Sequence, residues 1–164
     1  MNRDDEPRFD PFLSLIPVLI VLGIIFLDRA TKIFFSHLLS VGESLPIIRN
    51  FLHMTLVHNT GIAFGLFRDQ GIVFIIIPII AVFLLIYNIS YYQRHREEIS
   101  WTYCLAFSLI LGGAIGNLID RVYYGYVIDF IDFQIWPVFN IADSAITIGA
   151  VMIAVKCIPR RKSG

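Results

Sequence analysis

Four long apolar segments constrain the fold of this chain more than any other feature of its sequence. They run over residues 11–27, 71–89, 101–119 and 141–158, and each is close to the ~20 residues with which a helix crosses a bilayer. Because 57% of the 164 residues are hydrophobic and only 16% are charged, a soluble domain of this size could not enclose its apolar surface. We therefore expect one all-α membrane domain over residues 1–164, with four transmembrane helices at approximately 11–38, 71–92, 100–122 and 140–158.

The basic residues that flank these segments predict their orientation. They gather before the first segment, between the second and third, and after the fourth: Arg3, Arg8, Arg94, Arg96, Lys156, Arg160, Arg161 and Lys162. Residues 40–70 contain only two basic residues, and residues 122–138 contain neither Lys nor Arg. By the positive-inside rule, both termini of this multi-pass chain are expected in the cytoplasm and these two connections outside.

The first apolar segment does not have the flanks of a cleaved signal peptide. Acidic residues precede it, and Asp28-Arg29 follow it where a small-residue cleavage site would be expected. We therefore expect this segment to remain in the mature chain as a membrane helix.

The connection between the first two segments is patterned like a small sheet rather than a plain loop. Residues 47–57 mix β-branched, aromatic and polar side chains, and Asn59-Thr60-Gly61 supplies a turn. We expect a small extracytoplasmic antiparallel β-sheet between helices 1 and 2, over approximately residues 40–67. A short amphipathic stretch around Phe67 to Gly71 is expected to follow it at the lipid interface.

Several classes of site are disfavoured by the sequence. The four histidines are scattered without the i, i+4 pairing of a helical zinc site, so we expect no metal. Cys104 and Cys157 both fall in apolar segments, and buried free thiols are their simplest interpretation. The formal net charge is zero and the basic residues are spread over the flanks, which disfavours nucleic acid as a partner.

Polar residues are rare within the expected helices, so their spacing is informative. Asp28 and Lys32 are placed at i, i+4, which favours a structural ion pair. Gly112, Gly113 and Gly116 form small-residue steps at which another helix can approach closely. Asn117 and Arg121 share a face of that helix, where they can hold a substrate backbone or join the helix to the outer sheet, and the structural role is favoured.

Two acids near the end of the chain lie in apolar surroundings. Asp129 is flanked by Ile128 and Phe130, and no Lys or Arg lies between residues 121 and 156. A carboxylate in such a place needs a proton or a like-charged partner that shares one. Asp143 has an equally good structural explanation, because Asn140 can be the N-cap of the last helix with Asp143 as its capping-box partner.

An excursion of the chain through Trp136-Pro137 can return Asp143 to the level of Asp129. Two carboxyl groups held close together cannot both ionise readily, so one stays protonated while the other acts as a base. Asp129 and Asp143 are thus candidates for aspartic-protease chemistry, in which the pair activates a water molecule without a cofactor.

Five ordered motifs also resemble those of the lipoprotein signal peptidases, or type II signal peptidases. They are residues 28–32 (DRATK), 58–64 (HNTGIAF), 112–121 (GGAIGNLIDR), 127–130 (VIDF) and 139–144 (FNIADS). The resemblance implies an aspartyl endopeptidase of the bacterial inner membrane. We expect the active site near the outer face and the enzyme to be a monomer among membrane lipids. It would remove the signal peptide of a prolipoprotein just before a diacylglyceryl-modified cysteine.

The resemblance also assigns roles to individual residues. Asp129 and Asp143 correspond to the catalytic pair. The remaining positions of the family pattern are expected to bind substrate or support the site: Asp28, Lys32, Asn59, Gly61, Ala63, Gly113, Asn117, Asp120, Arg121, Asn140 and Ala142.

A small proton-coupled membrane transporter is the alternative from another functional class, because intramembrane acids can carry protons. The acids of this chain cluster at one expected membrane face rather than at the midplane, and no internal repeat relates the first two helices to the last two. These features favour the peptidase.

Overall fold

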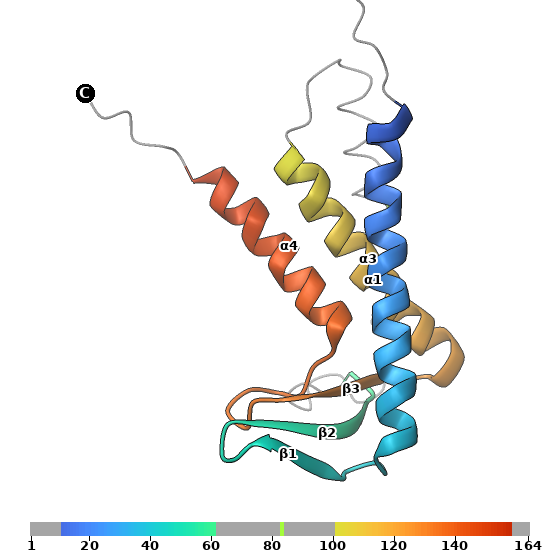
Figure 1. The fold of residues 1–164 in the computed structure, drawn as a ribbon, viewed down its shortest axis with the longest axis vertical. Coiled ribbons are helices and arrows are strands. Elements are labelled where there is room, and N and C mark those ends of the chain that lie inside the picture. Colours follow the sequence, from blue (N-terminus) through green and yellow to red (C-terminus); the bar gives the residue numbers. More distant parts are fainter. Residues whose placement is uncertain (1–10, 62–82, 84–100, 159–164) are drawn as a thin grey trace, which may run out of the picture.

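The computed structural model describes residues 11–61, 83 and 101–158. Its elements are α1 (Pro11–Leu38), β1 (Ser44–Ile48), β2 (Leu52–Asn59), α3 (Trp101–Tyr124), β3 (Val127–Asp132) and α4 (Ile141–Cys157). The three described helices rise from the sheet. The start of α1 and the end of α4 lie at the ends of these helices that are farthest from the sheet (Figure 1). Apart from residue 83, the helix expected at 71–92 lies outside the described residues, as does the expected stretch Phe67 to Gly71.

The sequence pattern explains where the helices begin and end. Helix α3 contains 24 residues, and its most apolar stretch of 18 residues has a mean hydropathy of 1.7; within the described part of the chain it is the one helix that meets the length and composition criteria for a membrane span. It ends at Gly125, which adopts a φ of 76° and donates its N–H to the Arg121 carbonyl at 3.1 Å. A glycine readily adopts this left-handed conformation, which ends many helices.

Small residues allow the helices to approach closely, as the glycine steps in the sequence predicted. A Cβ atom at Gly113 would collide with the carbonyl oxygen of Ala142 in α4, and one at Gly149 would lie 2.6 Å from the carbonyl oxygen of Ala106 in α3. A Cβ atom at Gly116 would lie 2.8 Å from Asp28 Oδ2 in α1. The glycines therefore bring α1 and α4 against α3 at backbone distance.

The sheet has the strand order β1-β2-β3, and both strand pairs are antiparallel. Val57 of β2 lies opposite Asp129 of β3, and Asn59 lies opposite Val127. The sequence correctly predicted a small antiparallel sheet but placed it wholly between helices 1 and 2. Its third strand comes instead from the segment between α3 and α4, since the buried residues of β3 provide the partner that the inner edge of β2 requires.

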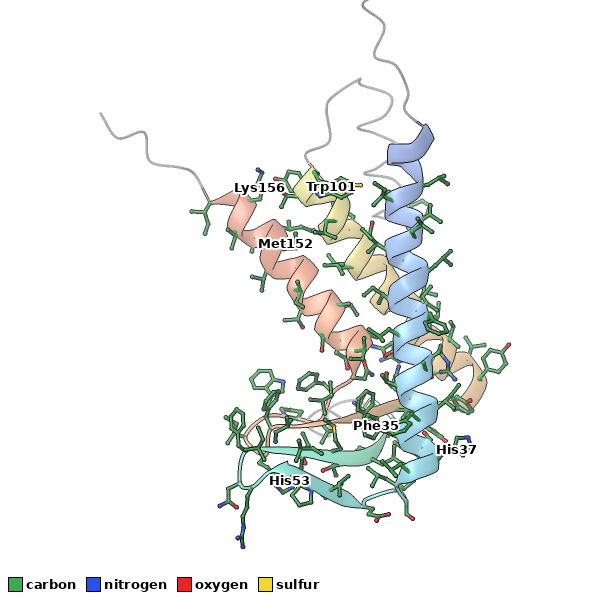
Figure 2. The ribbon with its side chains drawn as sticks, in the orientation of Figure 1. Phe35, His37, His53, Trp101, Met152 and Lys156 are labelled. Atoms are coloured by element: carbon green, nitrogen blue, oxygen red, sulfur yellow. The ribbon has the colours of Figure 1, made fainter. Side chains whose placement is uncertain are left out.

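Apolar contacts attach the sheet to the end of α1. The rings of Phe35 in α1 and Phe130 in β3 stack with centroids 4.5 Å apart, and Leu39, Leu56 and Ile128 form a buried cluster beside them. Figure 2 shows Phe35 at the sheet end of α1, whereas Trp101 and Lys156 lie at the opposite end of the helices. The sheet thus caps one end of the helices and holds β3 beside the beginning of α4.

Candidate active site

Asp129 lies on β3, facing the junction of the sheet with the helices. It is 1% exposed. Its Oδ2 accepts a hydrogen bond from Asn59 Nδ2 at 2.8 Å, and its Oδ1 accepts one from Asn140 Nδ2 at 2.7 Å. Asn59 reaches it because residues diagonally opposite on paired strands share a face of the sheet. Gly61, with a φ of 88°, donates its N–H to Asn59 Oδ1 at 2.9 Å and thereby turns the Asn59 amide nitrogen toward Asp129.

Asp143 lies in the first turn of α4, where the capping box expected from the sequence is present. The Asp143 N–H donates to Asn140 Oδ1 at 2.9 Å, and the Asn140 N–H donates to Asp143 Oδ2 at 3.2 Å. The other carboxylate oxygen, Oδ1, accepts a hydrogen bond from Asn117 Nδ2 of α3 at 2.8 Å. Capping therefore occupies only one of its two oxygens, and the structural explanation does not account for the whole environment of Asp143.

Asn140 connects the two acids. Its side chain is fully buried, and its Nδ2 donates to Asp129 Oδ1 while its Oδ1 accepts from the Asp143 N–H. The same Nδ2 also lies 3.0 Å from Asn117 Oδ1 and 3.2 Å from the Ile128 carbonyl oxygen. The side-chain amide of Asn140 thus binds the Asp129 carboxylate and the Asp143 main chain, while the Asn140 main-chain N–H binds the Asp143 carboxylate.

The electrostatic surroundings separate the two acids. The pKa of Asp129 is raised from its ordinary value of 3.8 to about 7, chiefly by burial and also by the negative charge of Asp143, while the hydrogen bonds from Asn59 and Asn140 act to lower it. Asp143 lies instead at the N-terminus of a helix, where the helix dipole and N–H donors favour a negative charge. Two neighbouring carboxyl groups in such different surroundings are typical of an acid and base pair.

A buried cluster of charges lies behind the two acids. Lys32 Nζ lies 2.8 Å from Asp28 Oδ2, the ion pair expected from the i, i+4 spacing, and also 2.8 Å from Asp120 Oδ2 of α3. All three side chains are 0% exposed. Asp120 also pairs with Arg29, a residue to which the sequence pattern gave no role of its own. The sequence contains a signal for this pair, because Arg29 and Asp120 each follow the C-terminal end of an apolar segment.

The chain between β3 and α4 turns back on itself, as the excursion through Trp136-Pro137 predicted. Phe139 pairs with Ile131 and returns the chain alongside β3. A cavity of about 420 Å³ opens beside Asp143, lined by Phe133, Trp136, Phe139, Asp143, Ser144, Thr147 and Ile148. A largely apolar cavity of this kind is suited to an apolar segment of a ligand.

The structure brings most of the predicted site residues together. Those that meet around the two acids or in the buried charge cluster are Asp28, Lys32, Asn59, Asn117, Asp120, Asp129, Asn140 and Asp143. Gly113 and Ala142 form the helix contact beneath them, and the Arg121 guanidinium donates to the Asn117 carbonyl oxygen at 3.4 Å. Ala63 and the side chain of Cys157 lie outside the described residues, and Cys104 is a half-buried free thiol.

Comparison with known proteins identifies the family. The family model of signal peptidase (SPase) II matches residues 20–159 of this chain. The chain belongs to the signal peptidase II family. The lipoprotein signal peptidase of Halothermothrix orenii is 43% identical over 147 residues, which cover 89% of this chain and 97% of the relative. That of Caldanaerobacter subterraneus is 44% identical over 137 residues, which cover 83% of this chain and 91% of the relative.

Solved structures agree with this membership. A bacterial membrane enzyme determined at 1.9 Å resolution superimposes with a TM-score of 0.77 at 34% identity and covers 90% of this chain and 94% of its own. A second structure of a bacterial membrane enzyme, at 2.3 Å, gives a TM-score of 0.75 at 33% identity. The resemblance read from the five motifs is confirmed: the chain is a membrane protease of the signal peptidase II family, and nothing supports the transporter alternative.

Proposed function

We propose that this signal peptidase II removes the signal peptide of diacylglyceryl-modified prolipoproteins by aspartyl catalysis, with Asp129 and Asp143 as the catalytic pair. The observation that carries the assignment is the position of Asn140: its buried side chain binds the Asp129 carboxylate and the Asp143 N–H, and its main-chain N–H binds the Asp143 carboxylate. A helix cap alone would not require the amide of Asn140 to reach across to β3. Holding two carboxyl groups in one fixed arrangement is what aspartyl catalysis requires.

The surroundings of the two acids suggest how they divide the work. Asp129, whose pKa burial raises to about 7, is the member that carries the proton. Asp143, in the first turn of α4, is the proposed base. Asp143 takes a proton from a water molecule that attacks the scissile carbonyl carbon, while Asp129 donates a hydrogen bond to the carbonyl oxygen as negative charge develops there. The reaction passes through a tetrahedral intermediate, and we expect it to need no cofactor.

The apolar cavity beside Asp143 is the proposed position for the apolar part of the substrate close to the cleaved bond. Backbone groups of a signal peptide drawn out of its helix must find hydrogen-bond partners in the protein, because lipid supplies none. Arg121, whose guanidinium lies on α3 near both acids, is suited to this role.

The proposed membrane arrangement has four transmembrane helices in one domain, with the second at approximately residues 71–92, outside the described residues. Large apolar side chains on α1 and α4 remain exposed, among them Leu19 at 63%, Phe26 at 73% and Val155 at 63%, which suits contact with lipid tails. Lys156 and Trp101 lie at the end of the helices away from the sheet (Figure 2). We therefore place both termini in the cytoplasm and the active site near the outer face of the bacterial inner membrane, in a monomer.

Substitution of the two acids tests the assignment. Asp129→Asn and Asp143→Asn should each lower the rate of cleavage of a lipidated prolipoprotein by about 10²–10⁴-fold or more, because asparagine keeps the shape but cannot exchange the proton. Cleavage is read by gel shift with purified protein, and circular dichroism checks that the helices remain folded.

Asp132 provides a matched control on the same strand. It is nearly buried like Asp129 but binds Thr55 Oγ1 at 2.7 Å and the Gln134 N–H at 2.8 Å, away from Asp143. Asp132→Asn should therefore retain cleavage. Full turnover by either dyad variant would refute the catalytic pair, and failure of the wild-type protein to cleave a lipidated prolipoprotein would refute the function.

A further inference from the structure

Lys32 makes contacts that reach both acids without touching either. Its Nζ lies 2.8 Å from Asp28 Oδ2 and 2.8 Å from Asp120 Oδ2, and it donates a hydrogen bond to Asn117 Oδ1 at 3.0 Å. The contact with Asp28 is an ion pair without a directed hydrogen bond, because Oδ2 has no hydrogen-bond partner. One buried ammonium group therefore joins residues of α1 and α3.

The two carboxylates that pair with Lys32 bind the main chain at equivalent points, each directly before one of the two acids. Asp28 Oδ1 accepts the N–H of Ala142 at 3.0 Å, and Ala142 directly precedes Asp143. Asp120 Oδ2 accepts the N–H of Ile128 at 3.1 Å, and Ile128 directly precedes Asp129. The residue before each proposed catalytic acid thus donates its main-chain N–H to a buried carboxylate, and both of these carboxylates pair with Lys32.

The third contact of Lys32 sets the orientation of an amide. Asn117 Oδ1 faces Lys32, so its Nδ2 faces Asp143 Oδ1 at 2.8 Å. With the amide reversed, its NH₂ group would point at the ammonium and its oxygen at the carboxylate, and both contacts would be repulsive. The Lys32 ammonium, together with the Asn140 Nδ2 donor at 3.0 Å from the same oxygen, therefore favours the orientation in which Asn117 donates to Asp143.

We propose that Lys32 is the positioning residue of the active site: its ammonium group fixes the main chain before both acids, orients the Asn117 amide, and sets the electrostatic balance between the acids. This inference rests on the proposed roles of Asp129 and Asp143. Lysine suits the position because its compact charge can meet three acceptors in different directions, whereas the planar fork of arginine cannot.

The charges around Asp129 allow this proposal to be tested by pH. Asp143 of α4 raises the pKa of Asp129, and Lys32 of α1 lowers it. Arg121 and Asp120 of α3 are also close to the two acids, with Asp28 of α1 behind them. Strand β2 contributes the neutral Asn59. Loss of the Lys32 charge should raise the pKa of Asp129 and move the alkaline limb of the rate profile to higher pH, since the pair would keep its shared proton longer.

The experiment compares the wild-type protein with Lys32→Met, with the double variant Asp28→Asn/Lys32→Met, and with Arg29→Met. Asparagine at position 28 can still accept the Ala142 N–H, and the double variant leaves no unpaired Asp28 charge, so it should fold even where Lys32→Met does not. Arg29→Met removes a positive charge from the same cluster, because Arg29 pairs with Asp120. Cleavage of a lipidated prolipoprotein is measured from about pH 5 to about pH 9, with kcat and KM at each pH and a thermal melt of each protein.

For the double variant we expect kcat to fall about tenfold or more with little change in KM, and the alkaline limb to rise by about half a pH unit or more. Arg29→Met should leave that limb in place, whatever it does to the melting temperature. If the folded double variant keeps the kcat of the wild-type protein and the same pH position of the alkaline limb, the proposal is overturned and Lys32 has a purely structural role. An equal shift in Arg29→Met would also overturn it, because the effect would then be one of total charge. Failure of the wild-type protein to cleave would instead refute the proposed function.

Discussion

Replacing Asn140 separates helix capping from the positioning of the acids. In Asn140→Ala, α4 loses its N-cap, which costs about 1 kcal/mol. Asp129 Oδ1 also loses its buried donor at 2.7 Å, which costs about 1–3 kcal/mol. The free energy of unfolding should therefore fall by about 2–4 kcal/mol.

Asn140→Ser divides these two contributions. A serine at the N-cap can still accept the N–H of Asp143, so about 1 kcal/mol should return relative to the alanine variant. Serine does not carry the NH₂ group that reaches Asp129, so neither variant holds the two carboxyl groups together. The cleavage rate of both variants should therefore be about 10²-fold lower than that of the wild-type protein.

Thermal melting in detergent and gel-shift cleavage of a lipidated prolipoprotein measure the two effects on the same samples. Ser108→Ala is the control, because it removes a hydrogen bond from a buried hydroxyl to the Cys104 carbonyl oxygen far from the acids. It should cleave like the wild-type protein. Recovery of cleavage by Asn140→Ser together with recovery of stability would show that Asn140 only caps the helix, and the reasoning would be wrong.

Two further predictions concern packing and pH. Gly113→Ala should lower stability by about 1–3 kcal/mol and reduce cleavage, because the added methyl group meets the Ala142 carbonyl oxygen. Gly23→Ala in α1 should be neutral or stabilising, because among the described residues no neighbouring segment comes within 4 Å of the added Cβ, and equal melting of the two variants would contradict this. Because the pKa of Asp129 rises from 3.8 in the unfolded chain to about 7 in the fold, the folded state binds more protons between these values, so stability should fall as pH rises from about 4 to about 7. Asp129→Asn should flatten this slope in a melting series, and an unchanged slope would assign it to another group.

The helices follow closely from the sequence. The first was expected at residues 11–38 and is found at Pro11–Leu38, and the last two differ from expectation by one or two residues at each end. The reason is that an apolar run of helix length has only one way to satisfy its backbone in lipid. The cap of α4 was equally local, because Asn140 and Asp143 interact across a single turn.

The sheet was predicted less completely. A hairpin within residues 40–59 is visible in β-branched residues and turn signals, but its pairing with β3 joins segments about seventy residues apart along the chain. Residues 127–130 were singled out for their acid rather than as a strand, since a short apolar run does not reveal its partner.

The sequence alone determined the three described helices, the family pattern and the two acids that the apolar surroundings mark as unusual. Only the tertiary structure decided how the acids are held: that Asn140 reaches from α4 to Asp129, that Asn59 crosses from β2, and that Lys32 joins Asp28 to Asp120. The physical reason is one of range. Helix formation and capping depend on neighbours within one or two turns, whereas a buried charge is stabilised only by partners that packing brings from distant segments.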